Sequence, residues 1–433
     1  MRRSPAVPAL LDTIAPPRLG GRFRLLFGAA WGMNLGDGIA LAAGPLLVAS
    51  LTDQAFLVAS AATVQWLPVL LFGLIAGAVT DRLDRRLIVV LLNVVRVGVL
   101  AVLSAAVITD AVSIAWVLVA LFLLGTAEIF ADNASQSLLP MVVERADLAV
   151  ANARLMTAFI GANQLAGPPI GAALFAIGMA WPFAAQGVLV LMGAVLISRV
   201  ALPAHGPARR AERGDGAGSG ARSRMRDDIR EGLAWVRRHA AVRTLVLTIF
   251  TFNITFGAAW SVLVLYVTQR LGLGSVGFGL VTTVGAVGGL AGTASYGWIT
   301  RRATLAQLLR IGLIVETLTH LGLALTREAW VALPIFFVFG AHAFIWGTTS
   351  QTVRQRAVPM ELQGRVGSVN SVATMGGLVF GSVVGGVLAQ HWGVTAPFWF
   401  AFAGSAVFVV LIWRQLAHVA HGDADAVELR RMP

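Results

Sequence analysis

The sequence predicts an all-α membrane protein, with twelve transmembrane helices in two six-helix bundles. Of its 433 residues, 57% are hydrophobic and only 12% are charged, whereas soluble domains carry about 25% charged residues. Twelve apolar stretches follow one another, each close to the roughly 20 residues that cross a bilayer as a helix. One long polar segment separates the first six from the last six. This composition excludes a soluble multidomain protein and a disordered chain.

Short polar breaks set the limits of the expected helices. The spans are 23–50, 55–79, 87–108, 114–138, 150–177, 181–202, 242–268, 275–299, 304–325, 330–353, 366–389 and 395–416. Before the first span, residues 1–20 contain four prolines and no long apolar run. This segment is therefore expected to be a cytoplasmic tail and not a cleaved signal peptide.

The basic residues predict the orientation of the chain in the membrane. All 33 are arginines, and 30 of them lie in the two tails, the even-numbered loops and the central segment, each counted with the helix ends that flank it. Only Arg270 and Arg327 lie in the odd-numbered loops, and Arg96 lies inside a span. Because basic residues concentrate on the cytoplasmic side, both termini are expected in the cytoplasm. This distribution accounts for the net charge of +12 without nucleic acid as a partner.

The central segment divides the chain into an N-terminal bundle, a cytoplasmic linker and a C-terminal bundle. The expected parts are 1–204, 205–241 and 242–433. Glycines between 214 and 220 predict a flexible first part of the linker. Its second part has an apolar face at helical spacing, formed by Met225, Ile229, Leu233 and Val236. Such an amphipathic helix lies either on the anionic inner leaflet or against the bundle, and the sequence favours neither.

The two halves of the chain resemble each other. Residues 125–137 align with residues 340–352 at a shift of 215, and both stretches contain a Ser-Gln pair near their ends. The glycine and charged pair at 77–82 align with those at 297–302 at a shift of 220. Two matches at nearly one offset indicate duplication of a six-helix unit.

The loop after the second span contains a ten-residue signature. Its fixed positions are Gly77, Asp81, Arg82, Arg85 and Arg86. At each of them it matches the G-x-x-x-D-R-x-x-R-R pattern of the major facilitator superfamily, which the chain therefore resembles. We expect this loop to act as an inner gate, because a carboxylate and nearby arginines can bridge segments that separate during transport. Asp132 in the fourth span is expected to hold one of the last two arginines.

Three further stretches narrow the resemblance. They are 138–155, 231–243 and 355–366. They are similar to the branch of the superfamily that includes the enterobactin exporter and bacterial macrolide and multidrug exporters. This resemblance implies a proton-driven exporter of a small organic compound, drug-like or siderophore-like, in the bacterial inner membrane. We expect it to work by alternating access, as a monomer and without a cofactor.

The fifth span contains part of an antiporter motif of the same superfamily. The matching residues are Gly167, Pro168 and Gly171. The alternative is a proline kink that shapes a packed helix.

Ionisable residues inside a span are costly and are candidate functional sites. Asp37 lies near the middle of the first span, one of four spans (1, 4, 7 and 10) that line the central cavity in the resembled fold. It is the first candidate for proton coupling, and hydrogen-bonded packing is the alternative. Glu128 in the fourth span is expected to share the proton or to bind a cationic substrate.

Other polar residues in the spans are candidates for pairing or for substrate binding. Arg96 and Glu316 are equivalent by the repeat, and each is expected to pair within its own half, for instance Glu316 with His320. The candidate substrate-binding residues are Asn34, Gln65, Asn253, Trp260, His342 and Trp346. Packing is the alternative role for all six.

The sequence shows no metalloprotease motif, no Ser-His-Asp set and no phosphate-binding loop. An enzyme, an ATP-driven pump and a metal site are therefore not expected. The absence of cysteine also excludes thiol catalysis. The expected partners are a small-molecule substrate, protons and membrane lipid. An importer of a small metabolite on the same fold and a non-transporting membrane sensor are the alternatives.

Overall fold

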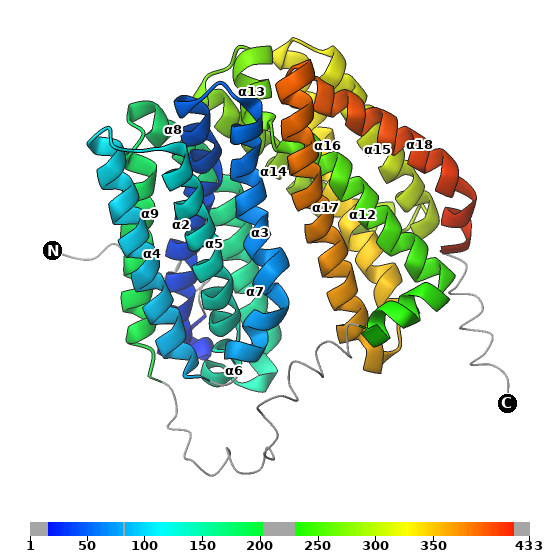
Figure 1. The fold of residues 1–433 in the computed structure, drawn as a ribbon. Coiled ribbons are helices and arrows are strands. Elements are labelled where there is room, and N and C mark those ends of the chain that lie inside the picture. Colours follow the sequence, from blue (N-terminus) through cyan, green and yellow to red (C-terminus); the bar gives the residue numbers. More distant parts are fainter. Residues whose placement is uncertain (1–15, 81–82, 202–229, 420–433) are drawn as a thin grey trace, which may run out of the picture. The chain divides into compact units, whose positions relative to one another are not determined.

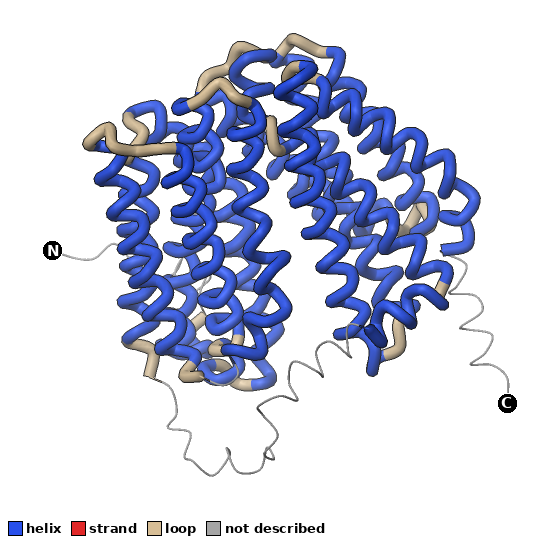
Figure 2. The backbone as a smooth tube through the Cα atoms, in the orientation of Figure 1, coloured by secondary structure: helices blue, strands red, loops and turns tan. Residues whose placement is uncertain are grey.

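The computed structural model describes residues 16–80, 83–201 and 230–419, and in these ranges it contains helices, short loops and no strand (Figure 1, Figure 2). Eleven of the described helices are long and apolar enough to cross a membrane. A further crossing is the continuous helical run 148–177, which joins α7 (Leu148–Ala158), the π-helical η3 (Phe159–Ala166) and α8 (Gly167–Ile177). The prediction of an all-α membrane fold is confirmed.

The long helices of the first half follow the expected spans. They are α2 (Gly20–Leu51), α3 (Ala55–Thr80), α4 (Arg85–Ile108), α5 (Ile114–Gln136) and α9 (Trp181–Ser198), beside the 148–177 run. Three short helices flank them: η1 (Pro17–Leu19), α6 (Leu139–Val142) and η2 (Arg145–Asp147). Hydropathy predicts these limits well because a segment in lipid must satisfy its own backbone hydrogen bonds, which a helix does.

The second half repeats this plan. Its helices are α12 (Ala240–Trp260), α13 (Leu263–Leu265), η4 (Tyr266–Arg270), α14 (Ser275–Ile299), α15 (Leu305–Leu325), α16 (Ala329–Ala357), η5 (Met360–Leu362), α17 (Gln363–Trp392) and α18 (Ala396–Val419). The expected span 242–268 is not one α-helix, because α12 ends at Trp260. The last part of the expected span is held by Tyr266, whose hydroxyl donates to the backbone carbonyl of Leu323 at 2.7 Å.

By its contacts, the chain divides into two compact units. The first is Met1–Leu51 with Leu71–Glu212, and the second is Thr52–Leu70 with Arg213–Pro433. In the first unit, α2 packs against α8 and α9, and α4 packs against α5 and α9. In the second unit, α12 packs against α17 and α18, and α15 packs against α16 and α18. These partners correspond in order along the two halves, which supports the duplication. The expected linker limits at 205 and 241 stay a prediction.

Close contact between α2 and α8 depends on glycine. A Cβ atom built at Gly38 would lie 2.9 Å from the Cα atoms of Asn163 and Gly167, closer than carbon atoms normally approach. The π-helical η3 ends directly before this contact. The glycines of the antiporter-like motif therefore position α8 on α2, next to Asp37.

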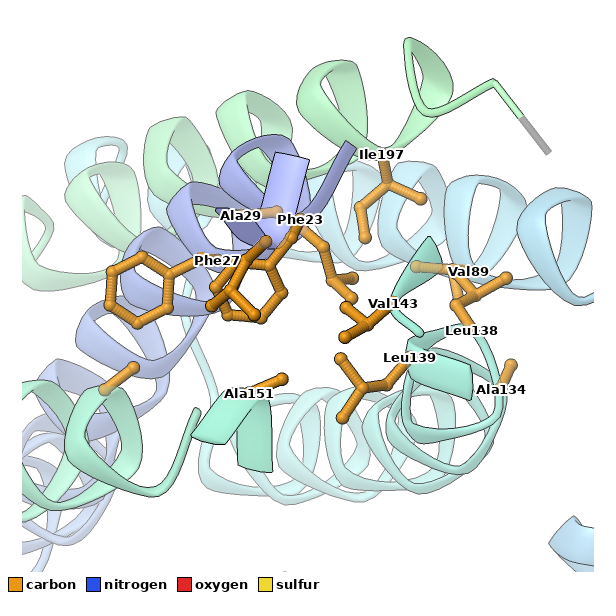
Figure 3. Close-up of a cluster of buried hydrophobic side chains, with 13 residues drawn as sticks. Phe23, Phe27, Ala29, Val89, Ala134, Leu138, Leu139, Val143, Ala151 and Ile197 are labelled. Atoms are coloured by element: carbon orange, nitrogen blue, oxygen red, sulfur yellow. The ribbon is translucent and has the colours of Figure 1, made fainter. Parts of the chain in front are cut away.

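An apolar cluster closes one end of the first unit (Figure 3). It joins Phe23 and Phe27 of α2 with Val89 of α4 and Leu138 at the end of α5. Ala151 of α7 contributes from the next helix along the chain. The stretch 138–155, which carries part of the family resemblance, thus has a packing role.

The helical residues 230–238, here called the linker helix, pack on the second unit. Glu231 Oε1 lies 2.6 Å from Nη1 of Arg365 at the start of α17, and Val236 is 4% exposed in an apolar cluster with Val358 and Val366. Of the two alternatives for the amphipathic helix, the described part favours packing against protein. Met225, Ile229 and residues 214–220 lie outside the described residues.

Candidate functional site

The first unit contains a buried ion pair at mid-helix. Asp37 of α2 is 9% exposed and Arg96 of α4 is 1% exposed, and Arg96 Nη2 donates to Asp37 Oδ1. Two amides extend the pair: Gln186 Nε2 of α9 donates to the same carboxylate oxygen at 3.2 Å, and Arg96 Nη1 donates to Asn93 Oδ1 at 3.1 Å. Removing either partner of such a pair leaves an uncompensated charge inside the protein.

A second carboxylate lies within reach of the same guanidinium. Glu128 Oε2 of α5 is 3.6 Å from Arg96 Nη2. Asp132, one turn further along α5, interacts electrostatically with Asp37 and Arg96. The structure therefore brings together three acids and one arginine: Asp37, Glu128, Asp132 and Arg96. The expected pairing of Arg96 within its own half is found, and its partners are the two carboxylates proposed for coupling.

The expected pairing of Asp132 with Arg85 or Arg86 is not found among the described residues. Arg86 donates to the carbonyl of Ser198, and Arg85 donates to the carbonyl of Ser137 at 3.3 Å. Both arginines at the start of α4 reach backbone carbonyls at helix ends instead, and Asp132 is exposed on α5. Of the other signature positions, Gly77 lies in α3, and Asp81 and Arg82 lie outside the described residues.

The second unit has its own buried pair. Glu316 of α15 is 8% exposed and His342 of α16 is 7% exposed, and Glu316 Oε2 lies 3.5 Å from His342 Nε2. The example pairing of Glu316 with the His320 side chain is wrong in detail. One turn later on the same helix, His320 bonds through Nδ1 to the backbone carbonyl of Glu316 at 2.9 Å.

Aromatic rings surround this pair. The Trp260 ring of α12 lies 4.4 Å from the Phe339 ring and 4.5 Å from the Phe256 ring, measured between centroids. It meets the His320 ring edge to face at 6.1 Å, and Phe339 lies 5.9 Å from the His342 ring. Trp260 and His342, both predicted substrate residues, are thus brought into one cluster.

The remaining predicted residues are placed as follows. Asn34 and Asn253 each donate to the carbonyl four residues earlier on their own helix, at 2.8 and 2.7 Å. Their spacing of 219 residues makes them repeat equivalents. Trp346 packs in the second unit with its indole nitrogen buried and without a partner. Gln65 is half-buried on α3. Their substrate-binding role stays a prediction.

Sequence reasoning missed Gln186 entirely. Its side chain is 2% exposed and contacts Asp37. A polar amide in the middle of an apolar span was the available signal, because such residues are rare in lipid unless they find a partner in the protein.

A multi-pass helical fold with buried charged groups at mid-helix defines a membrane transporter. The chain matches the transmembrane secretion effector family over residues 12–433. It belongs to this family, within the major facilitator superfamily, and the resemblance read from the sequence is confirmed.

One relative is a multidrug efflux pump and another is a multidrug resistance protein. The multidrug efflux pump Tap of Mycolicibacterium fortuitum is 30% identical over 405 residues, which cover 87% of this chain and 91% of Tap. Multidrug resistance protein 1 of Bacillus subtilis is 26% identical over 270 residues, or 61% of this chain and 64% of that protein.

Solved structures share the fold. A point mutant of the nucleoside transporter NupG superposes with a TM-score of 0.72 at 9% identity, over 91% of this chain and 99% of NupG. A bacterial homologue of the iron transporter ferroportin in the inward-facing state gives 0.70 at 17% identity, over 91% of this chain and 98% of that chain. At these identities the likeness shows the fold alone.

Proposed function

We propose that the protein is a proton-coupled secondary exporter of small organic compounds and that Asp37 carries the proton. The observation that supports this is the buried Asp37–Arg96 pair with Glu128 at 3.6 Å from the same guanidinium. Two multidrug relatives support export as the direction of transport.

The charge balance of this group favours exchange of a proton for a substrate. Arg96 keeps its proton at all working pH values, and three carboxylates interact with it. When all three are ionised the group is negative overall, which is unfavourable in a low-dielectric interior. A proton or the cationic part of a substrate relieves this excess. A site that releases the proton when it takes up the substrate couples the movement of proton and substrate in opposite directions.

The two nearest carboxylates have different roles in this proposal. Asp37 is the more buried, and its side chain is 10% exposed against 36% for Glu128. We therefore assign the proton to Asp37 and substrate contact to Glu128. Alternating access exposes the group first to one side of the membrane and then to the other.

Transport by the purified protein in proteoliposomes with an imposed pH gradient tests the proposal. The panel includes the organic cation ethidium together with neutral and anionic compounds. The Asp37→Asn variant is expected to lose proton-driven transport while it stays folded. Glu128→Gln is expected to change substrate range or affinity more than coupling. Wild-type flux in Asp37→Asn would contradict the assignment, and movement of the compound in the same direction as the protons would favour an importer.

We also propose that the signature loop is the inner gate. A charge-assisted contact there stabilises one state by about 1.5–3 kcal/mol when partly desolvated, enough to shift a two-state balance roughly tenfold. Asp81→Asn should therefore slow transport of the best panel compound and leave its equilibrium binding intact. Loss of binding with an unchanged rate per bound molecule would contradict a gating role.

A further inference from the structure

The Glu316–His342 pair takes no part in the coupling proposed above. Both side chains are buried within the second unit, on α15 and α16. By the repeat shift of 220, Glu316 stands where Arg96 stands in the first unit. The buried charged residues Arg96 of α4 and Glu316 of α15 thus have opposite signs. Each has a partner on the following long helix, Glu128 for Arg96 and His342 for Glu316.

The chemistry of the two pairs differs because of the base. Arginine does not release its proton in proteins, whereas histidine does so near neutral pH. An ionised Glu316 beside a neutral His342 leaves one uncompensated negative charge. A single proton, bound to the imidazole or to the carboxyl, removes that charge. An uncompensated charge inside a membrane protein costs several kcal/mol. The Glu316–His342 pair therefore retains a proton while water is excluded from it, and it can release the proton when water reaches it.

No described cation is placed to neutralise Glu316 instead. The helices packed around the pair are α12, α14, α16 and α18. On these helices and α15, the other ionisable side chains described are Arg243, Tyr296, Arg310, His320, Arg354 and Arg356. Arg310 precedes Glu316 by six residues, about 9 Å along a helix axis, and stacks on Trp413. The remaining arginines lie near the ends of α12 and α16.

His320 adds a second buried imidazole, one turn after Glu316 on α15. Its Nδ1 must donate, because its partner is the carbonyl oxygen of Glu316. Its Nε2 is then a lone-pair acceptor, and it is buried without a hydrogen-bond partner. The side chain is fully buried. The cluster therefore contains one buried carboxylate and two buried imidazoles, on Glu316, His342 and His320.

We propose that Glu316 and His342 form a proton-binding site of the second unit, separate from the Asp37 group of the first. The site binds one proton, held between the imidazole Nε2 and the carboxylate. This inference goes beyond the proposed function and holds whether or not Asp37 couples transport.

Magic-angle-spinning NMR of the full chain in liposomes, with ¹⁵N-labelled histidine, tests the site without a substrate. His342→Gln identifies the His342 signals by their loss. In the otherwise unchanged protein, these signals are expected to pass from neutral to protonated imidazole as the pH falls from about 9 to about 5. In Glu316→Gln the midpoint should fall by about one pH unit or more, because a carboxylate partner shifts a group by 1–3 units.

His391 provides the matched control, because it is an exposed histidine bonded to its own helix. Its titration should be the same with and without Glu316. A His342 ring that keeps one protonation state across this range, or a midpoint that Glu316→Gln leaves unchanged, would overturn the proposal. If Glu316→Gln does not fold, a new protonated-carboxyl infrared band in His342→Gln replaces it, because Glu316 must then hold the proton itself, and the absence of such a band overturns the site. The His342 signals should titrate in Asp37→Asn as they do in the unchanged protein. The test of this site is therefore independent of whether Asp37 couples transport.

Discussion

At the scale of single residues, Arg96 determines how much negative charge the first unit can hold. It is 1% exposed and contacts both Asp37 and Glu128. A neutral residue there leaves the buried carboxylate of Asp37 and the partly exposed carboxylate of Glu128 without that cation. Breaking a buried pair from one side costs about 3–5 kcal/mol, whereas replacing both partners is often close to neutral.

We therefore expect Arg96→Met to lower the free energy of unfolding in mild detergent by about 3–5 kcal/mol. The double variant Asp37→Asn/Arg96→Met should recover at least half of that loss and still fail to transport. The matched control is Arg302→Met, since Arg302 is exposed and stacks on Trp298 at 3.9 Å. It should change the free energy by under about 1 kcal/mol. Equal losses in the single and double variants would show that Arg96 stabilises by packing alone.

The sequence predicts which residues are ionisable in the membrane, but not how they pair. Asp37, Glu128 and Arg96 stand out because each interrupts an apolar run. Their contacts depend on the rotation and crossing of α2, α4 and α5, which hydropathy does not contain. For the same reason the sequence pairs Asp132 with the arginines of the signature loop, whereas Arg85 and Arg86 donate to the carbonyls of Ser137 and Ser198.

At the scale of elements, the linker helix shows how two stretches of the family resemblance meet. One stretch contributes Glu231 and Gly232, and the other contributes Arg365. The ion pair is partly exposed and is worth under about 1 kcal/mol. The close approach has more effect, because a Cβ at Gly232 would lie 2.7 Å from the carbonyl oxygen of Arg365.

Gly232→Ala therefore separates docking from helix propensity. Propensity alone favours alanine over glycine by about 1 kcal/mol in a helix interior, whereas the close approach predicts a loss of stability. We expect the melting temperature in mild detergent to fall. Gly367→Ala is the control, because Gly367 lies inside α17 with no atom within 4 Å of a built Cβ. A higher melting temperature in both variants would mean that the linker helix does not dock.

Hydropathy predicts the helices but not their π-helical segments. Both η3 and η4 lie within apolar stretches whose composition is that of an ordinary helix. The extra residue per turn is set by tertiary contacts, such as the close packing of Gly38 on Gly167. Such segments occur frequently at functional sites, and η3 ends beside the helix turn that carries Asp37.

At the scale of the whole molecule, the order of packing partners is the same in both units. With six crossings in each half, as the sequence predicts, each half begins and ends on the same side of the membrane. The arginine distribution predicts that this starting side is the cytoplasm.

The last prediction tests this orientation with single thiols. The chain has no cysteine, so each introduced thiol is the only one that a membrane-impermeant maleimide can label. Asp53 and Glu328 are exposed in loops expected outside, and Glu144 and Met360 are exposed in loops expected inside. Cysteines at the first two should be labelled in intact spheroplasts, and cysteines at the last two only in everted vesicles. Agreement at Asp53 and Glu144 with reversal at Glu328 and Met360 would mean that the second half of the chain is inverted. A parallel duplication would then be excluded, and with it the equivalence of Arg96 and Glu316.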